Sequence, residues 1–190
     1  MQISRILYPI STLGPGERLV IWTIGCSKKC YKCANPELWK EDISKDINPG
    51  ELANNIREAL NGKKVDGVTI TGGDPLEQSS DLITLIKELK SITDDVLVFT
   101  GFTLEEVKKE LSKIEYEELI ENVSVFITGS YIDKLNDNKC PLRGSSNQEI
   151  IFFDEKKVKL YKTYLHKKRT IQNVYVDERL FSVGIHNKEY

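Results

Sequence analysis

The sequence has no strong excess of charge of either sign. Lys and Arg number 27 against 29 Asp and Glu, giving a net charge of −2. Dedicated nucleic-acid-binding proteins usually carry a marked basic excess, so this balance argues against that class. Long hydrophobic runs are also missing, because the longest apolar stretch is Leu19 to Ile24 and includes Thr23. Such a stretch cannot span a bilayer, and the first residues lack a signal-peptide pattern. We therefore expect a cytoplasmic protein with neither nucleic acid nor a membrane as its partner.

Repeats, low-complexity tracts and long Gly/Ser linkers are absent as well. The 190 residues are 39% apolar and 29% charged, which suits a folded chain of one compact domain with a small appendage. The periodic pattern weakens after residue 130. We predict a core domain over residues 1–153 and a C-terminal extension over 154–190 that packs on the core.

Cysteines are few but clustered. There are four, and three of them, Cys26, Cys30 and Cys33, fall within eight residues, whereas Cys140 is distant. In a reducing compartment such a cluster is more typical of metal binding than of a disulfide framework. The three-cysteine segment is therefore predicted to hold a metal centre.

Short β-rich runs alternate with amphipathic helical patterns. Strands are predicted over residues 18–24, 67–71, 96–100, 123–128 and 149–153. Asn48 is the expected N-cap of the first helix, with an apolar stripe of Leu52, Ile56, Ala59 and Leu60. Later helices are predicted from Leu82, Leu85, Ile86 and Leu89, and from a Thr103–Glu106 capping box followed by Leu104, Val107 and Leu111. Strands alternating with helices indicate an α/β fold with a mostly parallel sheet.

The last part of the chain has a different pattern. Residues 156–169 predict a basic amphipathic helix with Val158, Tyr161 and Leu165 on one face, and residues 171–176 and 180–185 predict a hairpin. Basic residues with interleaved tyrosines can signal nucleic acid or a membrane surface. A solvated helix face explains this stretch more simply, with protein docking as the functional alternative.

Residue chemistry alone allows more than one kind of metal centre and more than one set of ligands. A structural zinc site would need a fourth ligand, for which Cys140, His166 and His186 are candidates. A cubane [4Fe–4S] cluster normally takes four cysteines, so three would leave one iron open. An open coordination position is typical of a catalytic rather than a structural centre.

The x3, x2 spacing of Cys26, Cys30 and Cys33 resembles the cluster loop of the radical S-adenosylmethionine (SAM) enzymes. Further segments resemble the activating proteins of anaerobic ribonucleotide reductase, in the same order along residues 8–150. They are Leu13-Gly-Pro-Gly-Glu-Arg18, Thr71-Gly-Gly-Asp-Pro-Leu76, Phe99-Thr-Gly-Phe102 and Arg143-Gly-Ser-Ser-Asn-Gln148. The resemblance implies an incomplete (β/α) barrel, with cluster and SAM at the C-terminal ends of the strands.

The resemblance also implies roles for individual residues. Cys26, Cys30 and Cys33 would ligate a [4Fe–4S] cluster whose open iron chelates SAM. The segment Gly72, Gly73 and Asp74 would bind the SAM amino group, and the backbone around Lys32 and Ala34 would lie near the adenine. Arg143 could present its guanidinium to a carboxylate of SAM or substrate, or it could belong to a surface loop.

The implied activity is reductive cleavage of SAM, yielding a radical that removes hydrogen from a glycine of a partner enzyme. A glycyl radical enzyme, anaerobic ribonucleotide reductase first, and a low-potential donor such as flavodoxin or ferredoxin are the implied partners. The alternatives are another peptide or protein substrate, or a non-catalytic electron-transfer or zinc-binding module. Because the chain is short, we expect the mouth of the barrel to stay open toward a macromolecular substrate.

Overall fold

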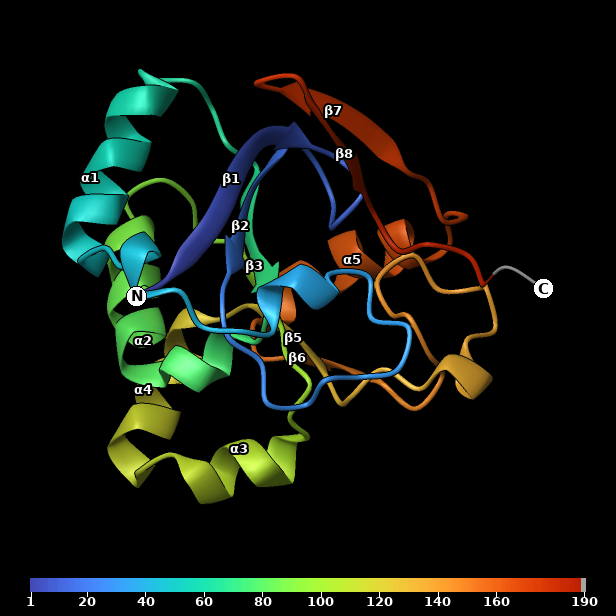
Figure 1. The fold of residues 1–190 in the computed structure, drawn as a ribbon. Helices are drawn as coiled ribbons and strands as arrows, with labels where there is room; N and C mark the ends of the chain where they lie inside the picture. The colour runs from blue at the N-terminus through green and yellow to red at the C-terminus, as the bar shows by residue number, and fades with distance from the viewer. Residues whose placement is uncertain (189–190) are drawn as a thin grey trace.

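A six-stranded sheet organises the protein, for which the computed structural model describes residues 1–188 (Figure 1). Its order follows the chain: β1 (Ile3–Ile10), β2 (Arg18–Thr23), β3 (Gly67–Gly72), β4 (Val96–Phe99), β5 (Val125–Thr128) and β6 (Glu149–Phe152). Strands β2 to β5 are parallel, whereas β1 and β6 run antiparallel to their neighbours. The predicted α/β class and mostly parallel sheet are confirmed. Within residues 1–188 the sheet is open at β1 and β6, an arrangement consistent with an incomplete barrel.

Strand β1 was not predicted from the sequence. Its outward positions are only partly covered, and Pro9 interrupts its pattern, so the strand carries a weak alternation signal. Strand β2, by contrast, is buried along its whole length and was predicted almost residue for residue. A continuous apolar run is the mark of a strand covered on both faces.

Helices α1 (Pro49–Leu60), α2 (Ser79–Leu89), α3 (Leu104–Glu110) and α4 (Lys113–Asn122) follow strands β2, β3 and β4, and α1, α2 and α4 stack along one side of the sheet (Figure 1). The Asn48 side chain accepts hydrogen bonds from the amides of Gly50 and Glu51, as predicted. One predicted core position is wrong: Ala59 is exposed, and Ala53 is buried instead.

The segment between β4 and β5 holds two helices where the sequence predicted one. The Thr103–Glu106 capping box opens α3 as expected. A second capping box, Ser112 with Glu115, opens α4, which was missed. Leu111 lies between the two helices and not on the inward face of one longer helix. Short 3-10 turns occur at Pro36–Leu38, Ile43–Lys45, Pro75–Gln78, Asp133–Leu135 and Glu155–Lys157.

Helix α5 (Val158–Leu165) and the antiparallel hairpin of β7 (Gln172–Val176) and β8 (Arg179–Val183) cover the other face of the sheet. The predicted helix over 156–169 is shorter than expected, and its tyrosines do not face solvent. Tyr161 is fully buried, and Tyr164 is buried and donates to the carbonyl of Ser11 at 3.0 Å. These tyrosines therefore serve packing, which removes the pattern that suggested nucleic acid or a membrane. No helix within residues 1–188 combines the length and apolar character needed to cross a membrane.

The face of the sheet that α5 and the hairpin cover is called the inner face below. A buried ion pair on this inner face is hydrogen-bonded to α5. The Arg18 guanidinium, 0% exposed, donates to the Asp95 carboxylate at 2.8 Å and to the Thr69 hydroxyl at 2.7 Å. The Tyr161 hydroxyl donates to the other Asp95 oxygen at 2.8 Å. Gly67 lies beside Arg18 in the sheet register, and a Cβ there would overlap the guanidinium. The glycine thus makes room for the charge.

Removing the Arg18 charge should destabilise the fold strongly. We expect Arg18→Met to lower the free energy of unfolding by about 3–5 kcal/mol, because Asp95 would stay buried without its cation. Denaturant titration followed by circular dichroism measures this. Lys113→Met is the control, since Lys113 pairs with Glu117 at an exposed position and should change stability by less than about 1 kcal/mol. Equal effects of the two substitutions would contradict the role given to Arg18.

Candidate metal centre

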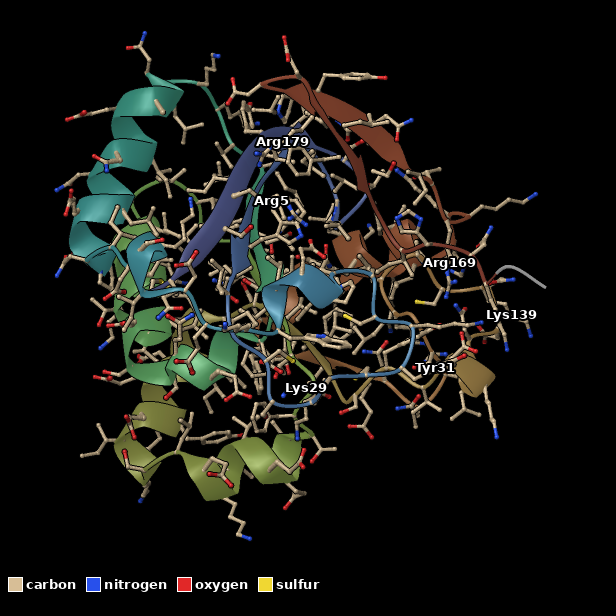
Figure 2. All side chains as sticks on the ribbon, viewed as in Figure 1. Arg5, Lys29, Tyr31, Lys139, Arg169 and Arg179 are labelled. Atoms are coloured by element: carbon tan, nitrogen blue, oxygen red, sulfur yellow. The ribbon has the colours of Figure 1, made fainter. Side chains whose placement is uncertain are left out.

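The cysteine loop leaves the C-terminal end of β2, where the parallel strands bring their loops together. Main-chain bonds fix its beginning: the Gly25 amide donates to the carbonyl of Leu38 at 2.8 Å, and that of Cys26 to the carbonyl of Trp39 at 3.1 Å. Further along, Lys29 and Lys32 adopt positive φ angles of 45° and 57°, which turn the loop back on itself. Lys29 and Tyr31 project from it at the surface (Figure 2).

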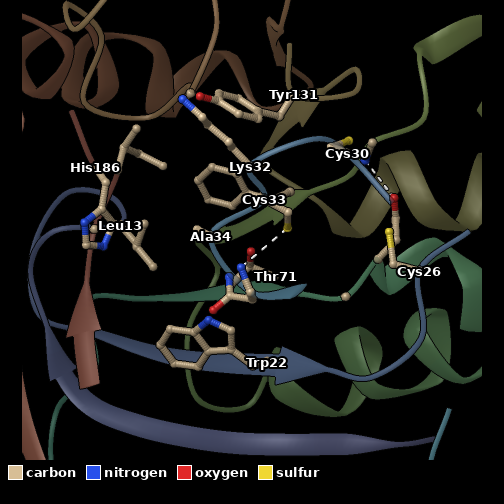
Figure 3. A pocket seen from close by; sticks show the side chains of 18 of the residues that line it. Leu13, Trp22, Cys26, Cys30, Lys32, Cys33, Ala34, Thr71, Tyr131 and His186 are labelled. Atoms are coloured by element: carbon tan, nitrogen blue, oxygen red, sulfur yellow. Dashed lines mark hydrogen bonds between the residues drawn. The ribbon is translucent and has the colours of Figure 1, made fainter. Parts of the chain in front are cut away.

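Cys26, Cys30 and Cys33 are free, half-buried thiols that line one cavity of about 870 Å³ (Figure 3). Burial raises the pKa of the Cys26 thiol, and a bound metal would counter this by stabilising the thiolate. The amide of Asn35 donates to the Cys33 sulfur at 3.4 Å. Hydrogen bonds to ligating sulfur are one of the factors that set the potential of an iron–sulfur centre.

The three thiols are ligands of one type on one short loop. Within residues 1–188, no group of three His, Cys, Asp or Glu side chains is already arranged to hold a single metal ion. A cubane imposes a different geometry, because each thiolate binds a different iron. Three soft thiolates on one short loop, facing one cavity, are a donor set that suits a [4Fe–4S] cluster with one open corner.

The candidate fourth ligands lie in different surroundings. Cys140 packs against the apolar cluster around Tyr161 and is not part of the cavity wall, and His166 is exposed at the end of α5. His186 is exposed and also borders the cavity, and its Nε2 lies 3.3 Å from the carbonyl oxygen of Ser182.

The glycines after β3 are needed by the protein's own main chain. Gly72 has a φ of 118°, and a Cβ there would overlap the backbone of Thr23. A Cβ on Gly73 would overlap the carbonyl oxygen of Gly25, next to Cys26. The Gly73 amide donates to the Thr23 carbonyl at 2.9 Å, and the Asp74 amide to the Gly25 carbonyl at 2.7 Å. The pair therefore joins β3 to the start of the cysteine loop, and Gly73 also lines the cavity.

Asp74 lines the cavity as predicted, but its carboxylate is already occupied by protein donors. One oxygen accepts from the Thr100 hydroxyl at 2.8 Å and the Leu76 amide at 3.1 Å, the other from the Gly101 amide at 2.7 Å. Burial raises its pKa to about 6, although these hydrogen bonds oppose the shift. The side chain ties the end of β3 to the end of β4.

The remaining predicted site residues differ in position. Lys32 and Ala34 line the cavity, and the Lys32 ammonium lies 3.6 Å from the Asp133 carboxylate. Arg143 is absent from the cavity wall, and its guanidinium donates to the carbonyl of Gln148 at 3.2 Å.

Gln148 was missed as an organiser of the loop. Its amide oxygen accepts from the amides of Gly144 and Ser145, and its amide nitrogen donates to the Gly129 carbonyl. The polar Arg143–Gln148 segment was the available sequence signal.

The expectation of a freely open mouth needs correction. Residues 180–188 form part of the cavity wall, and His186 lies toward one side of the cavity while Cys26 and Cys30 lie toward the other (Figure 3). The chain after residue 153 therefore narrows access from one side, because it folds back over the inner face of the sheet.

Comparison with known proteins agrees with this geometry. Residues 12–151 match the family described as a 4Fe-4S single cluster domain. The chain belongs to this family. An anaerobic ribonucleoside-triphosphate reductase-activating protein of Enterobacteria phage T4 is 32% identical over 161 residues, which cover 79% of this chain and 93% of the relative. The protein of that name from Escherichia coli K12 is 26% identical over 150 residues, 75% of this chain and 94% of the relative.

A pyruvate formate-lyase-activating enzyme of Staphylococcus epidermidis is 31% identical over 151 residues, which cover 75% of this chain but only 57% of that enzyme. The predicted resemblance to radical SAM activating proteins is confirmed, and with it a [4Fe–4S] cluster and SAM as cofactors. The roles of the individual residues stay predictions.

Each of the three loop cysteines should be required for the cluster. We expect Cys26→Ala, Cys30→Ala and Cys33→Ala each to lose the iron–sulfur absorbance after anaerobic reconstitution, whereas wild type should take up about four irons per chain. Cys140→Ala is the matched control and should keep its iron. Iron loss in Cys140→Ala equal to that of the other three would make our ligand set wrong.

The close contact between Gly73 and the Gly25 carbonyl should be needed for iron binding, although glycine itself supplies no ligand. Gly73→Ala would push the Gly25 carbonyl away and displace Cys26, so we expect it to lose most of the iron and also to melt at a lower temperature. Gly50→Ala is the control, because a Cβ there meets only the Asn48 side chain, at 3.2 Å. Iron content per chain after reconstitution is the measurement, and normal loading of Gly73→Ala would show that the contact is dispensable.

Proposed function

We propose that this protein is a radical SAM activating enzyme that generates a glycyl radical on a partner enzyme, anaerobic ribonucleotide reductase. The observation that carries the proposal is the three-thiol loop in a cavity built from strand ends, within a chain that matches reductase-activating proteins over 93–94% of their length. The pyruvate formate-lyase-activating relative is covered over 57% of its length, which favours the reductase as partner.

Cys26, Cys30 and Cys33 would hold three irons of the cluster, and the fourth would remain free for the amino and carboxylate groups of SAM. The bound cluster and SAM would together supply the radical chemistry that removes a hydrogen atom from the partner's glycine, with the electron coming from an external reductant. The chain itself contributes the walls of the cavity in which these groups would lie. Its cavity of about 870 Å³ has room for more than one small ligand.

The proposed SAM contacts are Lys32 and Ala34 on the cysteine loop and Gly72, Gly73 and Asp74 after β3. Because the Asp74 carboxylate already accepts three hydrogen bonds, we assign it to bracing the strand ends, with main-chain groups of the segment facing the SAM amino group. Arg143 would act indirectly, through the loop that carries Gln148.

The reductant is proposed to be a low-potential flavodoxin or ferredoxin that approaches the cysteine loop from outside. Lys29 and Tyr31, which is 75% exposed, project from the outside of the loop, and no acidic residue lies between positions 26 and 36. Such a surface suits an acidic protein donor. Free thiols at all four cysteines agree with a reducing compartment, and we propose the cytoplasm.

A two-step anaerobic experiment tests the proposed function. The reconstituted protein with dithionite and SAM should release 5′-deoxyadenosine, because the open iron can bind and cleave SAM. Mixing with anaerobic ribonucleotide reductase should then produce a glycyl radical signal in electron paramagnetic resonance.

Pyruvate formate-lyase serves as the comparison partner and should give a much weaker signal. An intact cluster that leaves SAM uncleaved would refute the activity and favour an electron-transfer module. SAM cleavage without a glycyl radical on the reductase would refute the partner and favour another peptide or protein substrate.

A further inference from the structure

The C-terminal segment lies outside the part of the chain that matches the family. The family match ends at residue 151, and the reductase-activating relative from Escherichia coli is covered almost completely while a quarter of this chain stays outside the match. Within that segment, α5 and the β7–β8 hairpin lie on the inner face of the sheet, and residues 180–188 line the cavity that holds the three cysteines.

The hairpin is held firmly at its base. The Thr12 hydroxyl donates to the Val183 carbonyl at 2.8 Å, and the Gln172 side chain bonds to the main chain of Ser11 and Pro9. Beyond the hairpin, Arg169 donates to the His186 carbonyl at 2.9 Å. These bonds make the hairpin a fixed wall of the cavity.

Side-chain stacking adds to this anchoring. The Arg5 guanidinium lies 4.9 Å from the Trp22 ring centroid and 5.1 Å from that of Phe181, so it bridges β2 and β8. Cation–π contacts of this kind contribute most where water is excluded.

Strand β8 presents its edge to the cavity. Leu180, Phe181, Ser182 and Val183, four consecutive residues of β8, all line the cavity, although side chains of a strand alternate between two faces. Consecutive lining residues are expected when the edge of a strand, and not one face, borders the space. Within residues 1–188, β8 pairs with β7 alone, so that edge has no partner strand.

The register shows which main-chain groups this edge offers. Asp177 and Glu178 have positive φ angles of 46° and 63°, typical of a two-residue type I′ turn, which makes Val176 and Arg179 the hydrogen-bonded closing pair. Hydrogen-bonded and non-bonded pairs alternate along an antiparallel ladder. Leu180, opposite Tyr175, and Ser182, opposite Asn173, are therefore non-bonded pairs whose N–H and C=O groups point away from β7.

We propose that the open edge of β8 binds an extended, glycine-bearing segment of the partner protein as an added β-strand. The inference rests on the proposed function, because a glycine Cα must enter this cavity to be activated. An extended segment entering there passes along β8, where the N–H and C=O of Leu180 and the N–H of Ser182 can bond to it whatever its side chains, whereas the Ser182 carbonyl already lies 3.3 Å from His186 Nε2. The half-exposed Leu180 side chain, which also borders the cavity, adds apolar contact.

Paired proline substitutions test the proposal, because Leu180 and Tyr175 lie opposite each other on the two edges of the hairpin. Leu180→Pro removes an N–H from the cavity edge without breaking a β7–β8 bond, and proline is tolerated at strand edges. Tyr175→Pro makes the same change on the other edge, which does not line the cavity. Leu180→Ala separates loss of the side chain from loss of the N–H.

The measurements use the full reconstituted chain: iron content, melting temperature, partner-independent 5′-deoxyadenosine formation, and the rate of glycyl radical formation at sub-saturating reductase. We expect Leu180→Pro to lower the glycyl radical rate by up to about tenfold, the size expected for one lost main-chain hydrogen bond, with iron and partner-independent SAM cleavage unchanged. Tyr175→Pro should match wild type, and Leu180→Ala should fall between.

Several outcomes would overturn the proposal. A Leu180→Pro rate equal to wild type, or an equal loss in Tyr175→Pro, would show that the edge does not bind the partner. Loss of partner-independent SAM cleavage would assign the edge to the cofactor. A wild-type dimer that Leu180→Pro dissociates would identify a second copy of the chain as the occupant. The wild-type protein alone tests the proposed function. If it cleaves SAM but forms no glycyl radical on the reductase, the proposed function fails and the edge proposal fails with it.

Discussion

The close approach of two stretches of main chain, at the ends of β2 and β3, is the constraint on which the site depends. The Gly25 carbonyl accepts a hydrogen bond from the Asp74 amide, and the Thr23 carbonyl accepts one from the Gly73 amide. The two stretches lie so close that a Cβ on residue 72 or 73 would overlap the facing main chain. The first cysteine follows Gly25 directly, so its position is set by main-chain bonds and not by side-chain packing. Main-chain bonds between strand ends are stiff, and a metal ligand placed by them can be held precisely enough for an open coordination site.

Asp74 extends the same constraint to β4. Its buried carboxylate accepts from Thr100 and Gly101, which begin the loop after that strand. A buried carboxylate is costly unless hydrogen-bonded, and here the bonds to three donors offset part of that cost. The cavity thus rests on three adjacent strand ends fastened to one another, while α1, α2 and α4 support the opposite face of the sheet.

On the inner face, one buried charge organises the packing of the C-terminal segment. Arg18 and Asp95 lie in a sheet interior that would otherwise be apolar, and Tyr161 of α5 completes their hydrogen bonding. The Tyr161 hydroxyl donates to the second oxygen of Asp95 and so ties α5 to the sheet. Further along the chain, residues 180–188 border the cavity. The C-terminal segment and the metal centre are therefore linked through the core.

The sequence by itself determined the local features of this protein: the four parallel strands, the helix caps at Asn48 and Thr103, and the three-cysteine loop. Each follows from neighbouring residues, through side-chain periodicity, capping chemistry or ligand spacing. Ala59 was wrongly placed in the core, and Ala53 and α4 were missed, because short amphipathic patterns allow more than one inward face. Only the tertiary structure decided that Gly73 packs on Gly25 and that the Asp74 carboxylate accepts hydrogen bonds from Thr100 and Gly101. It also placed Arg143 outside the cavity wall. It also brought residues 180–188 beside the cysteines. These contacts join segments far apart in the chain, and no local pattern encodes which distant main chain a glycine or a carboxylate will meet.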